Sequence, residues 1–104
     1  MSASRRPIDI PVYVVTPPRV LLLDVAGPVE VLRKANLVQD AIRFQVAYVG
    51  PAQRVGSSIG LDVAGIAPLP DDLPGDALVL LPGAADIPLG EPATSRREDA
   101  ESGV

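Results

Sequence analysis

Short apolar runs separated by turn residues predict three strands along the chain. The first run, 12–15, reads Val-Tyr-Val-Val, and Pro11 fits at or just before its start because proline cannot donate a hydrogen bond inside a sheet. The second run, 42–49, alternates apolar and polar residues, which is typical of a half-exposed strand. The third run, 77–81, is wholly apolar between turn residues and predicts a buried central strand.

A helix is predicted between the first two strands, over 20–35. Its apolar positions recur at helical spacing and form one stripe: Leu21, Val25, Val29 and Leu32. Gly27-Pro28 interrupts the pattern. Proline is favoured at the first helical position, so propensity starts the helix at Pro28, whereas the earlier apolar residues favour an earlier start with a kink. On the polar side, Glu30 and Lys34 are spaced to form an ion pair.

The order of elements predicts an α/β fold. Residues 54–63 form a short ribbon that turns through a Gly- and Ser-rich segment, so the order is strand, helix, strand, ribbon, strand. This order is the beginning of a flavodoxin-like, doubly wound parallel sheet, here incomplete, with ligands expected at the carboxyl ends of the strands. We expect the α/β part to span 8–89, between a disordered start at 1–7 and a disordered polar tail at 90–104.

Composition removes several classes of chemistry. The chain has no cysteine and no histidine, which excludes disulfides, metal sites built on these ligands, thiol catalysis and the usual general base. A net charge of −4 argues against nucleic-acid binding by this chain itself. The sequence contains neither a signal peptide pattern nor an apolar run long enough to span a membrane, so we expect a cytoplasmic protein without cofactor or metal.

Other polar residues are better explained as turn residues than as sites. Ser57 and Ser58 lack a partner base, so the turn role is preferred to a nucleophilic one. The segment 82–85 lacks the spaced glycines of a phosphate loop, and a strand-terminating turn is preferred. The remaining acidic residues do not have the spacing of a calcium loop: Asp71, Asp72, Asp76 and Asp86.

Three segments together resemble a known superfamily. They are Leu-Asp-Val-Ala-Gly-Pro-Val-Glu-Val-Leu at 23–32, Ser-Ser-Ile-Gly-Leu at 57–61 and Asp-Ala-Leu-Val-Leu-Leu-Pro-Gly at 76–83. In this order and spacing they resemble the amino-terminal part of the ThiJ/PfpI superfamily, which has the class I glutamine amidotransferase-like fold. The closest branches are the sensor domain of GlxA-type AraC-family transcriptional regulators and the isocyanide hydratases. The resemblance covers 12–83.

The resemblance implies a pocket and assigns residues to it. In catalytic branches a cysteine on a strand-to-helix elbow is the nucleophile, an acidic residue of the first helix hydrogen-bonds it, and N–H groups after a Pro-Gly-Gly-like turn hold the oxyanion. The regulator branch uses this pocket to sense a ligand, and a C-terminal helix-turn-helix pair binds DNA. Here Asp24 matches the acidic position and Pro82-Gly83 the turn, with Gly27 a further pocket candidate. Ala84 replaces the second glycine, at a cost of about 1 kcal/mol if that position needs a positive φ.

The elbow nucleophile and the helix-turn-helix region have no counterpart in these residues. We therefore expect no catalytic residue and no enzymatic activity, but a truncated ligand-sensing domain resembling that of an AraC-family regulator. The alternative is a fragment of an isocyanide hydratase or PfpI-like hydrolase. Without a cysteine beside it, Asp24 of this chain is better explained as a carboxylate stabilised by the start of the helix, and the pocket role is expected in an intact relative. An uncovered sheet edge further predicts self-association.

Overall fold

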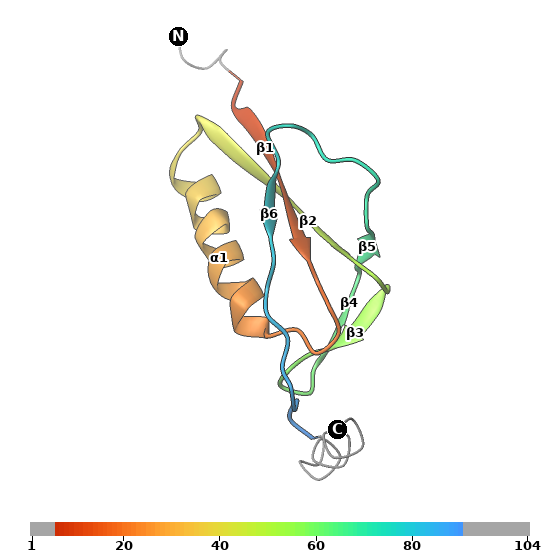
Figure 1. Cartoon of the computed structure of the whole chain (residues 1–104). Coiled ribbons are helices and arrows are strands. Elements are labelled where there is room, and N and C mark those ends of the chain that lie inside the picture. Colours follow the sequence, from red (N-terminus) through yellow and green to blue (C-terminus); the bar gives the residue numbers. More distant parts are fainter. Residues whose placement is uncertain (1–5, 91–104) are drawn as a thin grey trace.

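A four-stranded parallel sheet with one helix along its side forms the framework of the protein (Figure 1). The computed structural model describes residues 6–90, so the expectations for residues 1–5 and 91–104 lie outside the described residues. The elements are β1 (Ile8–Val15), α1 (Leu22–Val38), β2 (Ile42–Gly50), β3 (Arg54–Gly56), β4 (Asp62–Ala64), β5 (Ala67–Pro68) and β6 (Leu78–Leu80). The sheet order β5-β2-β1-β6 agrees with the expected incomplete flavodoxin-like α/β fold.

Strand β1 lies in the middle of the sheet. It pairs with β2 over its whole length, from Ile8 opposite Ile42 to Val15 opposite Val49. On its other side it pairs with the short β6. Strand β6 is therefore an edge of the described sheet, and the prediction of a buried central strand at 77–81 is wrong: Leu78 is 48% and Val79 45% exposed. Apolar composition alone does not distinguish a strand paired on both sides from one paired on a single side.

The first strand begins earlier than predicted and takes Pro11 into its interior. Strand β1 starts at Ile8, so Pro11 is its fourth residue. The β6 ladder reaches β1 only from Val12 onward. At Pro11 one side of β1 is therefore unpaired, and a strand tolerates a missing N–H at such an edge.

Helix α1 likewise begins before the proline. It runs from Leu22 and contains Pro28, which confirms the earlier start and excludes Pro28 as the first helical residue. Of the predicted stripe, Val25, Val29 and Leu32 are all half-buried. Burial of this stripe outweighs the loss of the hydrogen bond that the Pro28 nitrogen cannot donate. On the polar side Glu30 pairs with Arg33 at 2.6 Å, and not with Lys34 as predicted.

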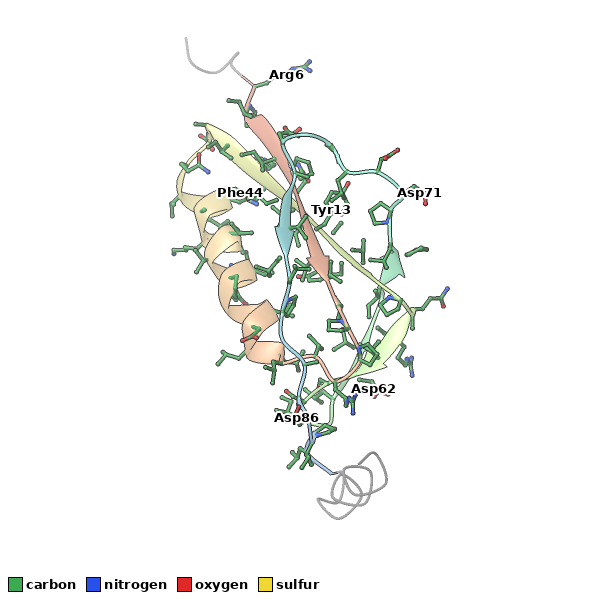
Figure 2. The ribbon with its side chains drawn as sticks, viewed as in Figure 1. Arg6, Tyr13, Phe44, Asp62, Asp71 and Asp86 are labelled. Carbon is green, nitrogen blue, oxygen red and sulfur yellow. The ribbon has the colours of Figure 1, made fainter. Side chains whose placement is uncertain are left out.

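The side-chain amides of Asn36 in α1 and of Gln39, just after it, cover the outer edge of β2. Asn36 Nδ2 donates to the Phe44 carbonyl at 3.0 Å, and the Phe44 N–H donates to Asn36 Oδ1 at 2.8 Å. Gln39 makes the same reciprocal pair with Ile42, at 2.6 and 2.9 Å. Ile42 and Phe44 are two residues apart, so their backbone groups point the same way. The two amides thus take the place of a neighbouring strand, and Phe44 lies beside α1 (Figure 2).

Buried side chains lie in two places: Val12 and Val14 are buried within β1, and a second group lies at the carboxyl end of the sheet. Val20, Val55 and Ile66 form a buried cluster, against which Val25 of α1 also packs. Helix α1 itself contains no fully buried residue. The antiparallel ribbon β3–β4, confirmed as predicted, supplies part of this cluster. The end of the sheet where ligands are expected therefore contains a buried apolar cluster.

Candidate functional site

Asp24 and Gly83 meet at the carboxyl end of β6. Asp24 lies in the first turn of α1, and Gly83 follows β6 in the chain. The Gly83 N–H donates a hydrogen bond of 3.0 Å to Asp24 Oδ2, across 59 positions of sequence. The two residues that sequence analysis assigned to one pocket are thus in direct contact.

Gly83 lies in an extended segment after β6, which backbone hydrogen bonds hold in place. This segment runs antiparallel to the residues before α1: the Leu21 N–H donates to the Gly83 carbonyl at 2.9 Å, and the Ala85 N–H to the Arg19 carbonyl at 2.8 Å. Gly83 is therefore held through both its N–H and its carbonyl. A Cβ at this position would lie 3.0 Å from Leu21 Cδ1 and 3.2 Å from Asp24 Oδ2, so the close approach itself favours glycine.

Ala84 causes none of the expected backbone strain. Among residues 6–90 the one non-glycine residue with a positive φ is Arg19, so Ala84 adopts a backbone conformation open to any residue. Ala84 forms an antiparallel bridge with Val20. The conditional cost attached to the missing second glycine therefore does not arise.

The other two pocket candidates differ in their placement. Pro82 is half-buried and leads directly into Gly83. Gly27 is exposed on α1, and nothing lies within 4 Å of where its Cβ would be. The structure therefore brings together Asp24 and Gly83, with Pro82 beside them in the chain, and leaves Gly27 on an open helix surface.

Ser57 shapes the ribbon turn next to this contact. Its side chain is buried, and its Oγ accepts hydrogen bonds from the N–H groups of Ile59 at 3.3 Å and Leu61 at 3.1 Å. The Ser58 N–H donates to the Val20 carbonyl at 2.8 Å, which ties the ribbon to the segment before α1. These bonds support the turn role preferred from the sequence.

Arg19 is a residue that sequence analysis did not single out. Its φ of 60° lies in the left-handed region, and it is held there by a 2.7 Å hydrogen bond from its N–H to the Gly56 carbonyl. It lines an open hollow of about 430 Å³ together with Ser57, Asp62 and Leu89. No local sequence signal marks this conformation, because arginine has no preference for a positive φ.

The acidic residues do not gather into a metal site. Within 6–90 no group of three or more His, Cys, Asp or Glu side chains is placed to hold an ion. Asp71 and Asp86 lie in different parts of the molecule (Figure 2). Asp62 faces Arg54 across the ribbon at 4.0 Å, an exposed pair of little energetic weight. In the same described part, no helix is long and apolar enough to cross a membrane.

Comparison with known proteins finds one kind of similarity, in three-dimensional structure. No protein-family model matches the sequence, and no curated protein matches it. Among solved structures, the chain is similar to an AraC family transcriptional regulator from Pseudomonas putida, with a TM-score of 0.64 and 22% sequence identity. The match covers 90% of this chain and 60% of the regulator chain. The chain thus shares its α/β fold with a region spanning less than two thirds of that regulator.

Proposed function

We propose that this chain is a cytoplasmic, non-catalytic ligand-sensing module, resembling the amidase-like sensor domain of AraC-family regulators within the ThiJ/PfpI superfamily. It has no DNA-binding region of its own in this proposal. The observation that carries the proposal is the hydrogen bond from the Gly83 N–H to Asp24 Oδ2. This bond joins the two sequence segments on which the resemblance mainly depends, at the sheet end where α/β proteins bind ligands.

The chemistry of the contact indicates the class of ligand. The Asp24 carboxylate is an acceptor with two oxygens, and Gly83 occupies part of the capacity of one. Asp24 is exposed, so a ligand can reach the second oxygen without unfolding the site. A small amide or amine, which presents N–H donors, complements this carboxylate.

The absence of cysteine and histidine supports sensing over catalysis. The hydroxyl of Ser57, which is buried, accepts hydrogen bonds from two backbone N–H groups in its own turn. Binding without turnover is the activity that the remaining carboxylate and backbone groups support.

Thermal unfolding with a panel of small amides, amines and carboxylates tests the proposal. We expect an amide or amine to raise the unfolding temperature of the wild-type chain and of the Asp40→Asn control. It should not raise that of Asp24→Asn, in which the carboxylate is replaced by an amide. Asp40 is an exposed carboxylate just beyond α1, so the control removes the same charge away from the site. Equal shifts in all three proteins, or no shift with any compound, would contradict the proposal.

A fragment of an isocyanide hydratase or PfpI-like hydrolase is the second candidate. The pairing of Asp24 with a backbone N–H of the Pro82-Gly83 turn favours it, because the resemblance assigns both groups to the catalytic pocket of those enzymes. The coding sequence beyond codon 104 separates the two candidates. An encoded elbow cysteine without a DNA-binding region supports the enzyme fragment, and an encoded helix-turn-helix supports the sensor. Turnover by this chain that is lost in Asp24→Asn would overturn the non-catalytic assignment.

A further inference from the structure

The two edges of the sheet differ in their capacity to accept another strand. Strand β5 has two residues, and one of them is Pro68, which has no N–H to donate. Strand β6, at the opposite edge, consists of Leu78, Val79 and Leu80 and pairs with β1 on one side. It carries none of the charged residues or prolines that protect edge strands from pairing. The adhesive edge of the described sheet is therefore β6.

An apolar groove adjoins this edge. Between β6 and α1 lies a hollow of about 430 Å³ whose lining contains no charged residue: Val12, Pro28, Val31, Leu32, Leu78, Val79 and Leu80. Val31, in its lining, is 67% exposed, and Leu81, which follows β6 in the chain, is 75% exposed. An unpaired backbone edge and an exposed apolar surface thus coincide at one place in the fold.

We propose that β6 pairs with β6 of a second copy of this chain, antiparallel about a two-fold axis at Val79, to form a closed dimer with one continuous sheet. In this register Leu78 lies opposite the partner's Leu80. Asp76 lies opposite the partner's Pro82, so no like charges face each other across the axis. The edge is therefore complementary to itself.

The difference between the two edges determines where assembly stops. Pairing β6 with β5 of another copy would leave an open edge at each end and would extend into a fibre. Strand β5 is too short for this and lacks a donor at Pro68. Pairing β6 with itself uses the adhesive edge of both copies, so association ends at two.

A strand of this length cannot hold the dimer alone. A stable interface buries roughly 800 Å² on each partner, far more than three residues supply. The exposed side chains of Leu81 and Val31, together with the groove, lie beside the edge and extend the contact surface. The dimer is therefore expected to combine backbone pairing with closure of the groove.

Sedimentation velocity over a range of concentrations tests the interface. Val79→Lys would place two ammonium groups opposite each other at the axis, and should weaken association by about tenfold or more. Leu73→Lys is the matched control, because Leu73 is 44% exposed against 45% for Val79 and lies in the loop before β6. The control should associate like the wild-type chain. Circular dichroism establishes whether each variant is folded.

Cross-linking tests the register independently of that substitution. The chain has no cysteine, so Val79→Cys introduces a single thiol. Directly opposed residues of antiparallel strands have Cα atoms about 4.5–5.5 Å apart, within the range that a disulfide spans. With dissolved oxygen accepting the two electrons and two protons from the thiols, Val79→Cys should form a covalent dimer that a reducing agent releases. Leu73→Cys should stay uncross-linked at the same concentration.

Several results would overturn the proposal. A wild-type chain that remains monomeric at every concentration excludes the dimer. Oligomers that keep growing beyond two copies exclude its closure. Equal weakening by Val79→Lys and Leu73→Lys, or equal cross-linking of the two cysteine variants, excludes β6 as the interface.

Discussion

The amide of Asn36 provides the sharpest test of how α1 is held to the sheet. Its side chain makes two hydrogen bonds to the Phe44 backbone, at 3.0 and 2.8 Å, in a partly buried setting. In Asn36→Ala both backbone groups of Phe44 lose their partner, and each lost hydrogen bond costs about 0.5–1.5 kcal/mol in this partly buried setting. Alanine is the better helix former, which returns up to about 0.7 kcal/mol. We expect a net loss of about 1–2 kcal/mol in the free energy of unfolding.

Urea denaturation followed by far-UV circular dichroism measures this loss, with all proteins at one concentration because self-association raises apparent stability. The matched control is Lys34→Ala, an exposed position on the same helix without a hydrogen bond to the sheet, which should change stability by less than about 0.5 kcal/mol. If Asn36→Ala loses no more than Lys34→Ala, the amide does not act as a substitute strand. A combined Asn36→Ala and Gln39→Ala variant should then also unfold like the wild-type chain, which would refute the reasoning for the whole edge.

Three further substitutions probe the backbone. Gly27→Ala should raise the free energy of unfolding by about 0.5–1 kcal/mol, because glycine is unfavourable inside a helix and nothing lies within 4 Å of the new methyl group; a loss in thermal or urea unfolding would show that Gly27 has a contact partner. Gly50→Ala should lower it by about 1–3 kcal/mol, because its Cβ would lie 2.6 Å from the Thr16 carbonyl oxygen; an unchanged urea midpoint would contradict that contact. Arg19→Gly should be stabilising by up to about 1 kcal/mol relative to Arg19→Ala, because both remove the side chain and only glycine relieves the positive φ; equal stabilities would contradict the left-handed conformation.

Local patterns were sufficient to predict most of the elements. The apolar stripe of α1 and the alternation in β2 follow from the period of side-chain burial. Strands β1 and β6 and the ribbon at 54–63 follow from short apolar runs and turn residues, and all of these are properties of neighbouring residues. The alternation in β2 also holds as far as Val46. It then inverts, with Tyr48 38% exposed and Val49 buried, because Val49 lies where β5 and the buried cluster meet the sheet.

Local propensity alone misplaces both prolines, and for the same reason. Pro11 and Pro28 lie inside elements that their local preferences would end or start. Each is tolerated because of its surroundings: one side of β1 is unpaired at Pro11, and the half-buried stripe of α1 extends across Pro28. Those surroundings are formed by residues distant in the sequence, which propensity does not include.

The candidate site was likewise only partly predictable from the sequence. The residue types Asp24, Pro82 and Gly83 were identified from the sequence, through spacing and resemblance. The antiparallel segment that sets Gly83 against Leu21 and Asp24, and the left-handed Arg19 beside it, depend on hydrogen bonds between segments far apart in the chain. Such bonds cannot be predicted from a local pattern of residues.

By itself, the sequence determined the α/β class, the order of its elements and the absence of thiol and imidazole chemistry, because these depend on composition and short-range periodicity. The tertiary structure alone decided that β6 is an edge of the described sheet, that a buried cluster forms at the carboxyl end of that sheet, and that the Gly83 N–H donates to Asp24. The physical reason is that strand order and backbone hydrogen bonding between distant segments are set by the packing of the whole chain, which no single segment encodes.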